Sequence, residues 1–205
     1  MPRPRFHRLA AAQQERILEA ALDEFAAHGY RDASLNRIIA SAGISKGSMY
    51  YYFDGKEDLY AQVIRDGLEH LLAGGGAVTV PADSDADAFW EALEQQYLHL
   101  MQRLTANPRL AGLLRDWLAG AGAPALGAAQ QEAEQATAPW LAQILAIGQG
   151  NGAVRTDLPA ELIIALALAM GQAIDTWLIT RPSDDAELAT TVHTLMATMR
   201  RALQP

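Results

Sequence analysis

Two lysines, Lys46 and Lys56, are the only ones in the chain, and both lie in the segment 44–57 with two serines and three consecutive tyrosines. Cationic and phenolic side chains at helical spacing are suited to holding the phosphates of a nucleic-acid backbone. The alternative is that two lysines share a solvated turn by chance. The pair alone leaves both interpretations open, so the elements that position it have to be considered.

Apolar residues recur at helical spacing along most of the chain, which predicts an all-α fold of about nine helices. The first helix is expected over about residues 11–28, with Gly29 as its C-terminal cap. Ser34 and Ser45 are expected to cap two short helices that are separated by Gly43. Two short helices joined by a turn that contains glycine are typical of a helix-turn-helix.

The remaining helices are expected to begin near Lys56 and to continue, with interruptions, to the C-terminus. Their predicted ranges are 56–73, 89–104, 110–118, 125–149 with a break near Pro139, 159–180 and 188–203. The apolar run 162–170 is too short to span a bilayer, which takes about 20 residues, and Gln172 and Asp175 interrupt its continuation. We therefore predict a helix buried on most of its surface and no membrane association.

The formal net charge is −8, which argues against a protein that coats nucleic acid indiscriminately. The excess acid is confined to residues 61–205, which carry sixteen Asp/Glu and eight Lys/Arg, whereas residues 1–60 carry eight of each. Any DNA contact is therefore expected from a local cationic face of the N-terminal part. The basic N-terminus is not followed by an apolar run, so no secretory signal is predicted and the cytoplasm is the expected location.

Residues from about 15 to 64 resemble the TetR family of bacterial transcriptional regulators. The resemblance rests on the runs 17–30 (ILEAALDEFAAHGY), 34–35 and 42–53 (AGISKGSMYYYF), and a weaker likeness covers 148–161. It implies a helix-turn-helix DNA-binding domain at residues 1–55 with a basic N-terminal arm. It further implies a helical domain at residues 56–205 that binds an effector and dimerises.

The docking geometry of a helix-turn-helix places the N-terminal residues of its second helix in the major groove. Lys46, Ser48 and Tyr50 are the expected contacts at or near base edges, and Gly47 allows close approach of the backbone. The expected phosphate contacts are Ser34, Ser45, Tyr51, Tyr52 and Lys56. The family commonly has a histidine where this chain has Tyr52, whose hydroxyl can still donate to phosphate. Met49 and Phe53 are expected in the core. The arginines of the N-terminal tail either reach a minor groove or belong to a disordered, solubilising end.

Two apolar stripes in the C-terminal part are expected to form a homodimer interface, the alternative being that both are buried inside one subunit. They are Leu162, Ala165, Leu166 and Ala169, and Leu188, Val192, Leu195 and Met199. The resemblance also implies an effector cavity. Its candidate residues are Tyr97, His99, Met101, Trp117, Trp140, Met170, Asp175 and Trp177. Asp175 stands out because a carboxylate within an apolar helix requires a partner, either a protein donor or a cationic or hydroxylated ligand.

No catalytic motif accompanies these features. Cysteine is absent, the five histidines are dispersed without metal-ligand spacing, and no nucleophile elbow or phosphate loop occurs. We therefore expect no enzyme, no metal and no cofactor. The predicted function is a ligand-responsive regulator, a repressor that binds a palindromic operator as a homodimer and is released by a small, largely apolar effector. The alternatives are an activator or corepressor-dependent regulator, and a helical ligand-binding module that does not bind DNA.

Overall fold

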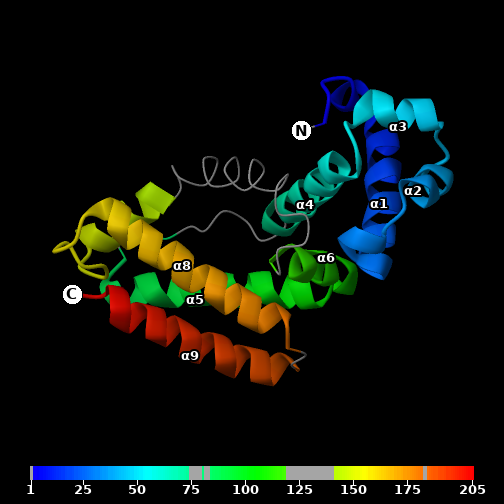
Figure 1. Cartoon of the computed structure of the whole chain (residues 1–205). Helices are drawn as coiled ribbons and strands as arrows, with labels where there is room; N and C mark the ends of the chain where they lie inside the picture. Colours follow the sequence, from blue (N-terminus) through cyan, green and yellow to red (C-terminus); the bar gives the residue numbers. More distant parts are fainter. Residues whose placement is uncertain (1, 74–79, 81–83, 119–140, 182–183) are drawn as a thin grey trace. The chain divides into compact units, whose positions relative to one another are not determined.

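The computed structural model describes residues 2–73, 80, 84–118, 141–181 and 184–205, and within these ranges every regular element is helical. The predicted all-α class is confirmed. The elements are a 3-10 turn η1 (Phe6–Arg8), α1 (Ala11–Asp32), α2 (Leu35–Ala42), α3 (Lys46–Tyr52), α4 (Lys56–Ala73), α5 (Ala86–Thr105), α6 (Pro108–Leu118), an unlabelled helix at residues 141–150, α8 (Ala160–Ile179) and α9 (Asp185–Leu203). Figure 1 shows their succession along the chain.

These helices belong to two compact units. The described residues of one unit are 2–70 and 107–118, and those of the other are 71–73, 80, 84–106, 141–181 and 184–205. The first unit therefore contains the helix-turn-helix together with α6 and most of α4. The domain boundary predicted between residues 55 and 56 stays a prediction.

In the first unit, α1 is the central helix, and its apolar face packs against both α2 and α6. Ile17, Ala21 and Phe25 are fully buried on that face. Gly29 leaves the helical conformation, with φ 67° and ψ 170°, so the regular part of α1 ends where the sequence predicts and a further turn reaches Asp32. A Cβ atom at Gly29 would lie 2.8 Å from Asp116 Oδ2 of α6, so glycine serves here for its conformation and for its small size.

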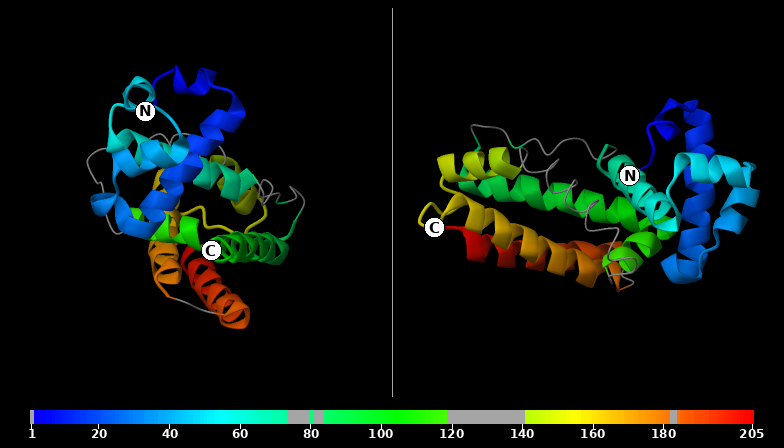
Figure 2. Two further views of the ribbon diagram at one scale, coloured as in Figure 1. Left: turned by 90° about the vertical axis from the view of Figure 1, so that its right-hand side faces the viewer. Right: turned by 45° about the horizontal axis from the view of Figure 1, so that its top comes forward.

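In the second unit, α5 and α8 both lie along α9, as the two views of Figure 2 show. Its core joins Phe89 and Trp90 of α5 with Val154, Ile163 and Leu203. The indole of Trp90 donates a hydrogen bond of 3.1 Å to the carbonyl of Ala153, which satisfies its buried N–H.

Helix α8 is less buried than predicted. Only 17% of its most apolar window is buried, and Leu162, Leu166 and Leu168 are exposed. The prediction of a helix buried on most of its surface is therefore wrong for the single chain, because only one side of α8 packs against its neighbours. By length and composition alone, with a mean hydropathy of 1.8, α8 could also cross a membrane. The carboxylate of Asp175 within this helix, hydrogen bonded to α5, favours packing against protein.

Candidate nucleic-acid interface

Helix α3 is fixed at both ends by local interactions. At its start, the hydroxyl of Ser45 accepts a hydrogen bond of 3.0 Å from the backbone N–H of Ser48, so the predicted N-cap is confirmed. Gly43 adopts the left-handed conformation between α2 and α3, with φ 65° and ψ 34°. Met49 and Phe53 are almost fully buried, which confirms them as the core pair and fixes the rotation of the helix.

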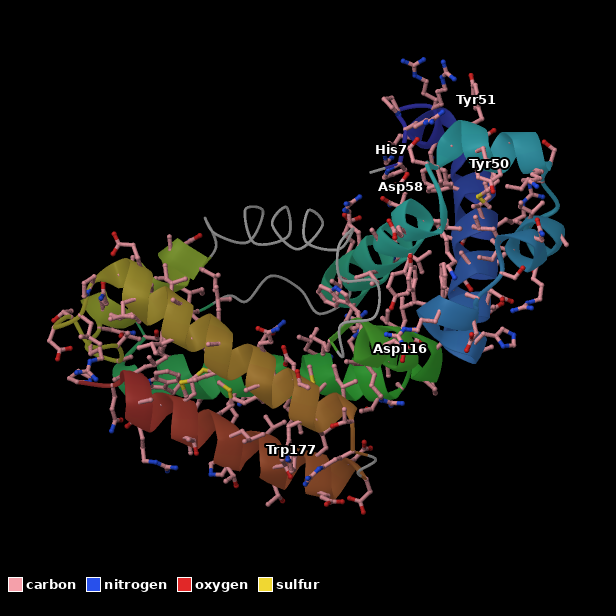
Figure 3. All side chains as sticks on the ribbon, in the orientation of Figure 1. His7, Tyr50, Tyr51, Asp58, Asp116 and Trp177 are labelled. Atoms are coloured by element: carbon pink, nitrogen blue, oxygen red, sulfur yellow. The ribbon has the colours of Figure 1, made fainter. Side chains whose placement is uncertain are left out.

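That rotation exposes several of the residues expected to contact DNA. Tyr50 and Tyr51 are 45% and 47% exposed, and both project from α3 (Figure 3). Ser45, Lys46 and Gly47 are also exposed at the start of the helix, whereas Ser48 and Tyr52 are half-buried. The structure therefore brings Ser45, Lys46, Gly47, Ser48, Tyr50, Tyr51 and Tyr52 onto one short helix and its cap. Cationic, hydroxyl and phenolic groups on a short exposed helix have the chemistry that contacts bases and phosphates.

The N-terminal segment is attached to the end of α3. Phe6 is fully buried, with its ring centre 4.8 Å from that of Phe53. The backbone N–H of Arg3 donates to the carbonyl of Tyr52 at 2.9 Å, and its guanidinium pairs with Asp54 at 2.5 Å. The alternative of a disordered tail is therefore wrong for residues 3–8. The sequence signal for this attachment is Phe6, an aromatic side chain within a basic stretch.

Attachment places cations beside the phenols of α3. The guanidinium carbon of Arg5 lies 4.2 Å from the centre of the Tyr51 ring, a cation–π geometry. The sequence indicates only that the tail arginines, as a group, could reach a minor groove. The structure places one of them directly beside a residue expected to contact phosphate.

Ser34 precedes α2, but its hydroxyl makes no capping hydrogen bond. Its backbone N–H instead donates to Glu24 Oε1 at 2.8 Å, and the same carboxylate accepts from the guanidinium of Arg37 at 2.5 Å. The hydrogen bond from Arg37 holds the pKa of Glu24 below its ordinary value. Glu24 therefore ties the start of α2 to α1, a role that sequence spacing did not reveal.

Lys56 occupies a different environment from that of an exposed phosphate ligand. Its ammonium donates to the carbonyls of Arg31 at 2.9 Å and Ala33 at 3.1 Å, and lies 4.9 Å from the centre of the Tyr30 ring. These carbonyls close the C-terminal end of α1, where a cation is favoured by the helix dipole. The phosphate contact stays a prediction, and the structure gives Lys56 a role in holding α1 to α4.

The candidate effector residues are distributed unevenly. The hydroxyl of Tyr97 on α5 donates to Asp175 Oδ1 on α8 at 2.5 Å. Of the two kinds of partner expected for this carboxylate, the chain itself therefore supplies a protein donor, a phenol. Among the other candidates, Met101 is buried, Met170 is half-buried, and His99 and Trp177 are exposed. Trp117 belongs to the first unit, and Trp140 lies outside the described residues.

The two stripes of the expected dimer interface also differ. On α8, Leu162, Ala165, Leu166 and Ala169 are all exposed. On α9, Leu188 and Val192 are buried within the chain, and Leu195 and Met199 are half-buried. Leu188 and Val192 therefore have no surface to offer a second copy, and for them the alternative of burial inside one subunit holds. Their spacing suited either location, because the same periodicity marks any buried helix face.

A capped recognition helix following α1 and α2, linked to a larger helical unit, defines a helix-turn-helix regulator of transcription. Residues 17–63 match the family model of bacterial regulatory proteins of the tetR family. The chain is 31% identical over 159 residues to the HTH-type transcriptional repressor SCO4008 of Streptomyces coelicolor, an alignment that covers 78% of this chain and 76% of that protein. The chain belongs to the TetR family.

One further relative agrees with this assignment, and one solved structure shares the fold. The HTH-type transcriptional regulator RutR of Escherichia coli is 42% identical over 66 residues, which are 32% of this chain and 31% of RutR. The chain thus matches about a third of the length of that regulator. The solved structure of a TetR family regulator from a Shewanella species superposes with a TM-score of 0.73 and 19% identity, covering 94% of this chain and 98% of that one, which shows a common fold.

Proposed function

We propose that this TetR-family regulator is a repressor that acts as a homodimer in the cytoplasm, binds a palindromic operator, and is released by a small, largely apolar effector. The observation that carries the proposal is the exposed face of α3, where Lys46, Tyr50 and Tyr51 point outward while Met49 is buried. A recognition helix needs a buried residue that fixes it to the rest of its domain. It also needs exposed polar residues that can contact DNA in the major groove.

Repression is supported by the relative SCO4008, which is named as a repressor and aligns over most of both chains. An activator or a corepressor-dependent regulator is the alternative within the class. A helical module without DNA binding is the alternative outside it. The exposed, cationic and phenolic face of α3 favours the DNA-binding alternatives.

Dimerisation is supported by the exposed apolar stripe of α8, which includes Leu162 and Leu166. Two helix-turn-helix units bound to one palindrome must present their recognition helices about 34–36 Å apart. An effector can release the operator only if it binds more tightly to a dimer with a different spacing, because equal affinity for both states shifts nothing.

The test is selection of genomic fragments by the purified full chain, followed by fluorescence anisotropy with the selected site and a scrambled duplex. Enrichment of a palindrome that binds far more tightly than the scrambled duplex supports the proposal. Reporter transcription from the selected site then separates the two modes of regulation. Lower transcription in the presence of the protein indicates a repressor, and higher transcription an activator.

A further inference from the structure

Asp175 is the one charged residue between positions 162 and 179, in the apolar body of α8. It lies next to the buried Ile174 and one turn before the buried Leu178. Its Oδ1 atom accepts the phenol proton of Tyr97 at 2.5 Å, and this is the one partner that the described part of the chain gives the carboxylate. A phenol satisfies one acceptor position but brings no positive charge.

Within the part of the chain that the structure describes, no cationic side chain pairs with Asp175. Every lysine, arginine and histidine lies in the described ranges, and no ion pair there involves Asp175. Cations that follow α8 or lie on α9 contact other groups. Arg181 lies over the ring of Trp177 at 4.3 Å, His193 pairs with Glu94 of α5 at 2.8 Å, and Arg200 pairs with Asp87 of α5.

An ionised carboxylate removed from water is costly unless a cation and hydrogen bonds compensate it. Burial accordingly raises the pKa of the Asp175 carboxyl above its ordinary value, and the Tyr97 hydrogen bond offsets this only in part. A ligand that carries a positive charge would remove this penalty, whereas a neutral ligand would leave it. The group is thus arranged to gain most from a cationic partner.

We propose that Asp175, with Tyr97 as its positioning partner, binds the protonated amine of an otherwise apolar effector. Apolar side chains on the same two helices, such as the buried Met101 one turn after Tyr97, are suited to the body of such a molecule. This inference rests on the proposed function, in which the C-terminal unit binds an effector. It narrows the effector to an amphipathic amine.

The preference for an amine is tested with three compounds that share the apolar adamantane cage and differ only in their head group. They are adamantylamine, adamantanol and adamantane carboxylate, each titrated into the full-length protein by calorimetry. We expect the amine to bind at least about tenfold more tightly than the alcohol, which corresponds to about 1.4 kcal/mol, and the carboxylate to bind weakest. Asp175→Asn should abolish the preference for the amine while leaving the affinity for the alcohol unchanged. The matched control is Glu161→Gln, which removes an exposed charge from the first turn of the same helix and should keep the preference.

Tyr97→Phe gives a second, independent variant. The carboxylate remains but loses the phenol that positions it, so the amine should bind more weakly than to the wild type and still be preferred over the alcohol. A purely structural role of the Tyr97–Asp175 pair predicts instead an equal loss of affinity for the amine and the alcohol. Equal binding of amine and alcohol by the wild type, no binding of any probe, or an intact preference in Asp175→Asn would overturn the inference. Operator binding is measured on the same preparations. If no amine preference is found but the operator is bound specifically, only the amine site is refuted. If specific operator binding is also absent, the proposed function fails as well.

Discussion

The guanidinium carbon of Arg5 lies 4.2 Å from the centre of the Tyr51 ring, so the N-terminal segment and α3 present a cation and a phenol side by side. Tyr51 is nearly half exposed despite this contact. Phe6 anchors the segment, because its side chain is fully buried and its ring packs against that of Phe53. The N-terminal arm is therefore part of the DNA-binding surface that we propose.

For Arg5, we expect Arg5→Ala to weaken operator binding severalfold and to reduce the slope of log K against log salt concentration by about one, since one phosphate contact is lost. Thermal stability should change little, because exposed cation–π pairs contribute only about 0.5–1 kcal/mol. Anisotropy titrations at several salt concentrations measure the slope. An unchanged slope would show that Arg5 does not contact phosphate.

Neighbouring positions on α3 should separate binding from folding. Tyr50→Ala should leave the free energy of unfolding within about 0.5 kcal/mol of the wild type and strongly weaken operator binding, because Tyr50 is exposed. Met49→Ala should destabilise the protein by about 2–5 kcal/mol, because Met49 is buried. Denaturant unfolding and anisotropy on both variants provide the comparison, and normal operator affinity in Tyr50→Ala would refute the role of this face.

The two roles of Lys56 make opposite predictions. Loss of its hydrogen bonds to the carbonyls of Arg31 and Ala33 in Lys56→Met should lower the free energy of unfolding by about 1 kcal/mol. The salt slope of operator binding should then fall by less than one. A full unit of change in slope with unchanged stability would instead establish Lys56 as a phosphate ligand.

The stripes on α8 and α9 should also respond differently to substitution. Leu166→Glu, at an exposed position of α8, should shift the protein from dimer to monomer without loss of helicity. Leu188→Ala, at a buried position of α9, should lower the free energy of unfolding by about 2–5 kcal/mol. The fraction of this variant that folds should still be dimeric. Analytical ultracentrifugation with circular dichroism measures both, and a dimer in Leu166→Glu would contradict the proposed interface.

Asp175 should make stability depend on pH. Burial raises its pKa in the folded state, so between the unfolded value of about 3.9 and the raised value the native state binds more protons than the unfolded state. The stabilisation from protonated Asp175 is full below this window and is lost as the pH rises through it. The difference in Tm, Asp175→Asn minus wild type, should therefore increase with pH across the window in thermal melts. A difference that is constant or decreases with pH would contradict this account.

Much of the DNA-binding unit could be predicted from the sequence, because local signals determine it. The glycines at 29 and 43, the cap at Ser45, and the spacing of Met49 and Phe53 each specify one conformation or one face. The attachment of the N-terminus, the Glu24–Arg37 pair and the engagement of Lys56 could not, because they join residues that are distant in sequence. In the C-terminal part, periodicity placed Leu188 and Val192 on one apolar helix face. It could not show whether the same chain or a second chain covers that face.

The most direct test of the proposed function is the anisotropy titration of wild type and Tyr50→Ala with the selected operator and with its scrambled duplex. A regulator that reads DNA with α3 should show a large preference of the wild type for the operator and a strong loss of that preference in a stably folded Tyr50→Ala. Equal, salt-sensitive binding of the wild type to both duplexes, or no binding to either, would contradict a sequence-specific regulator that reads DNA with α3.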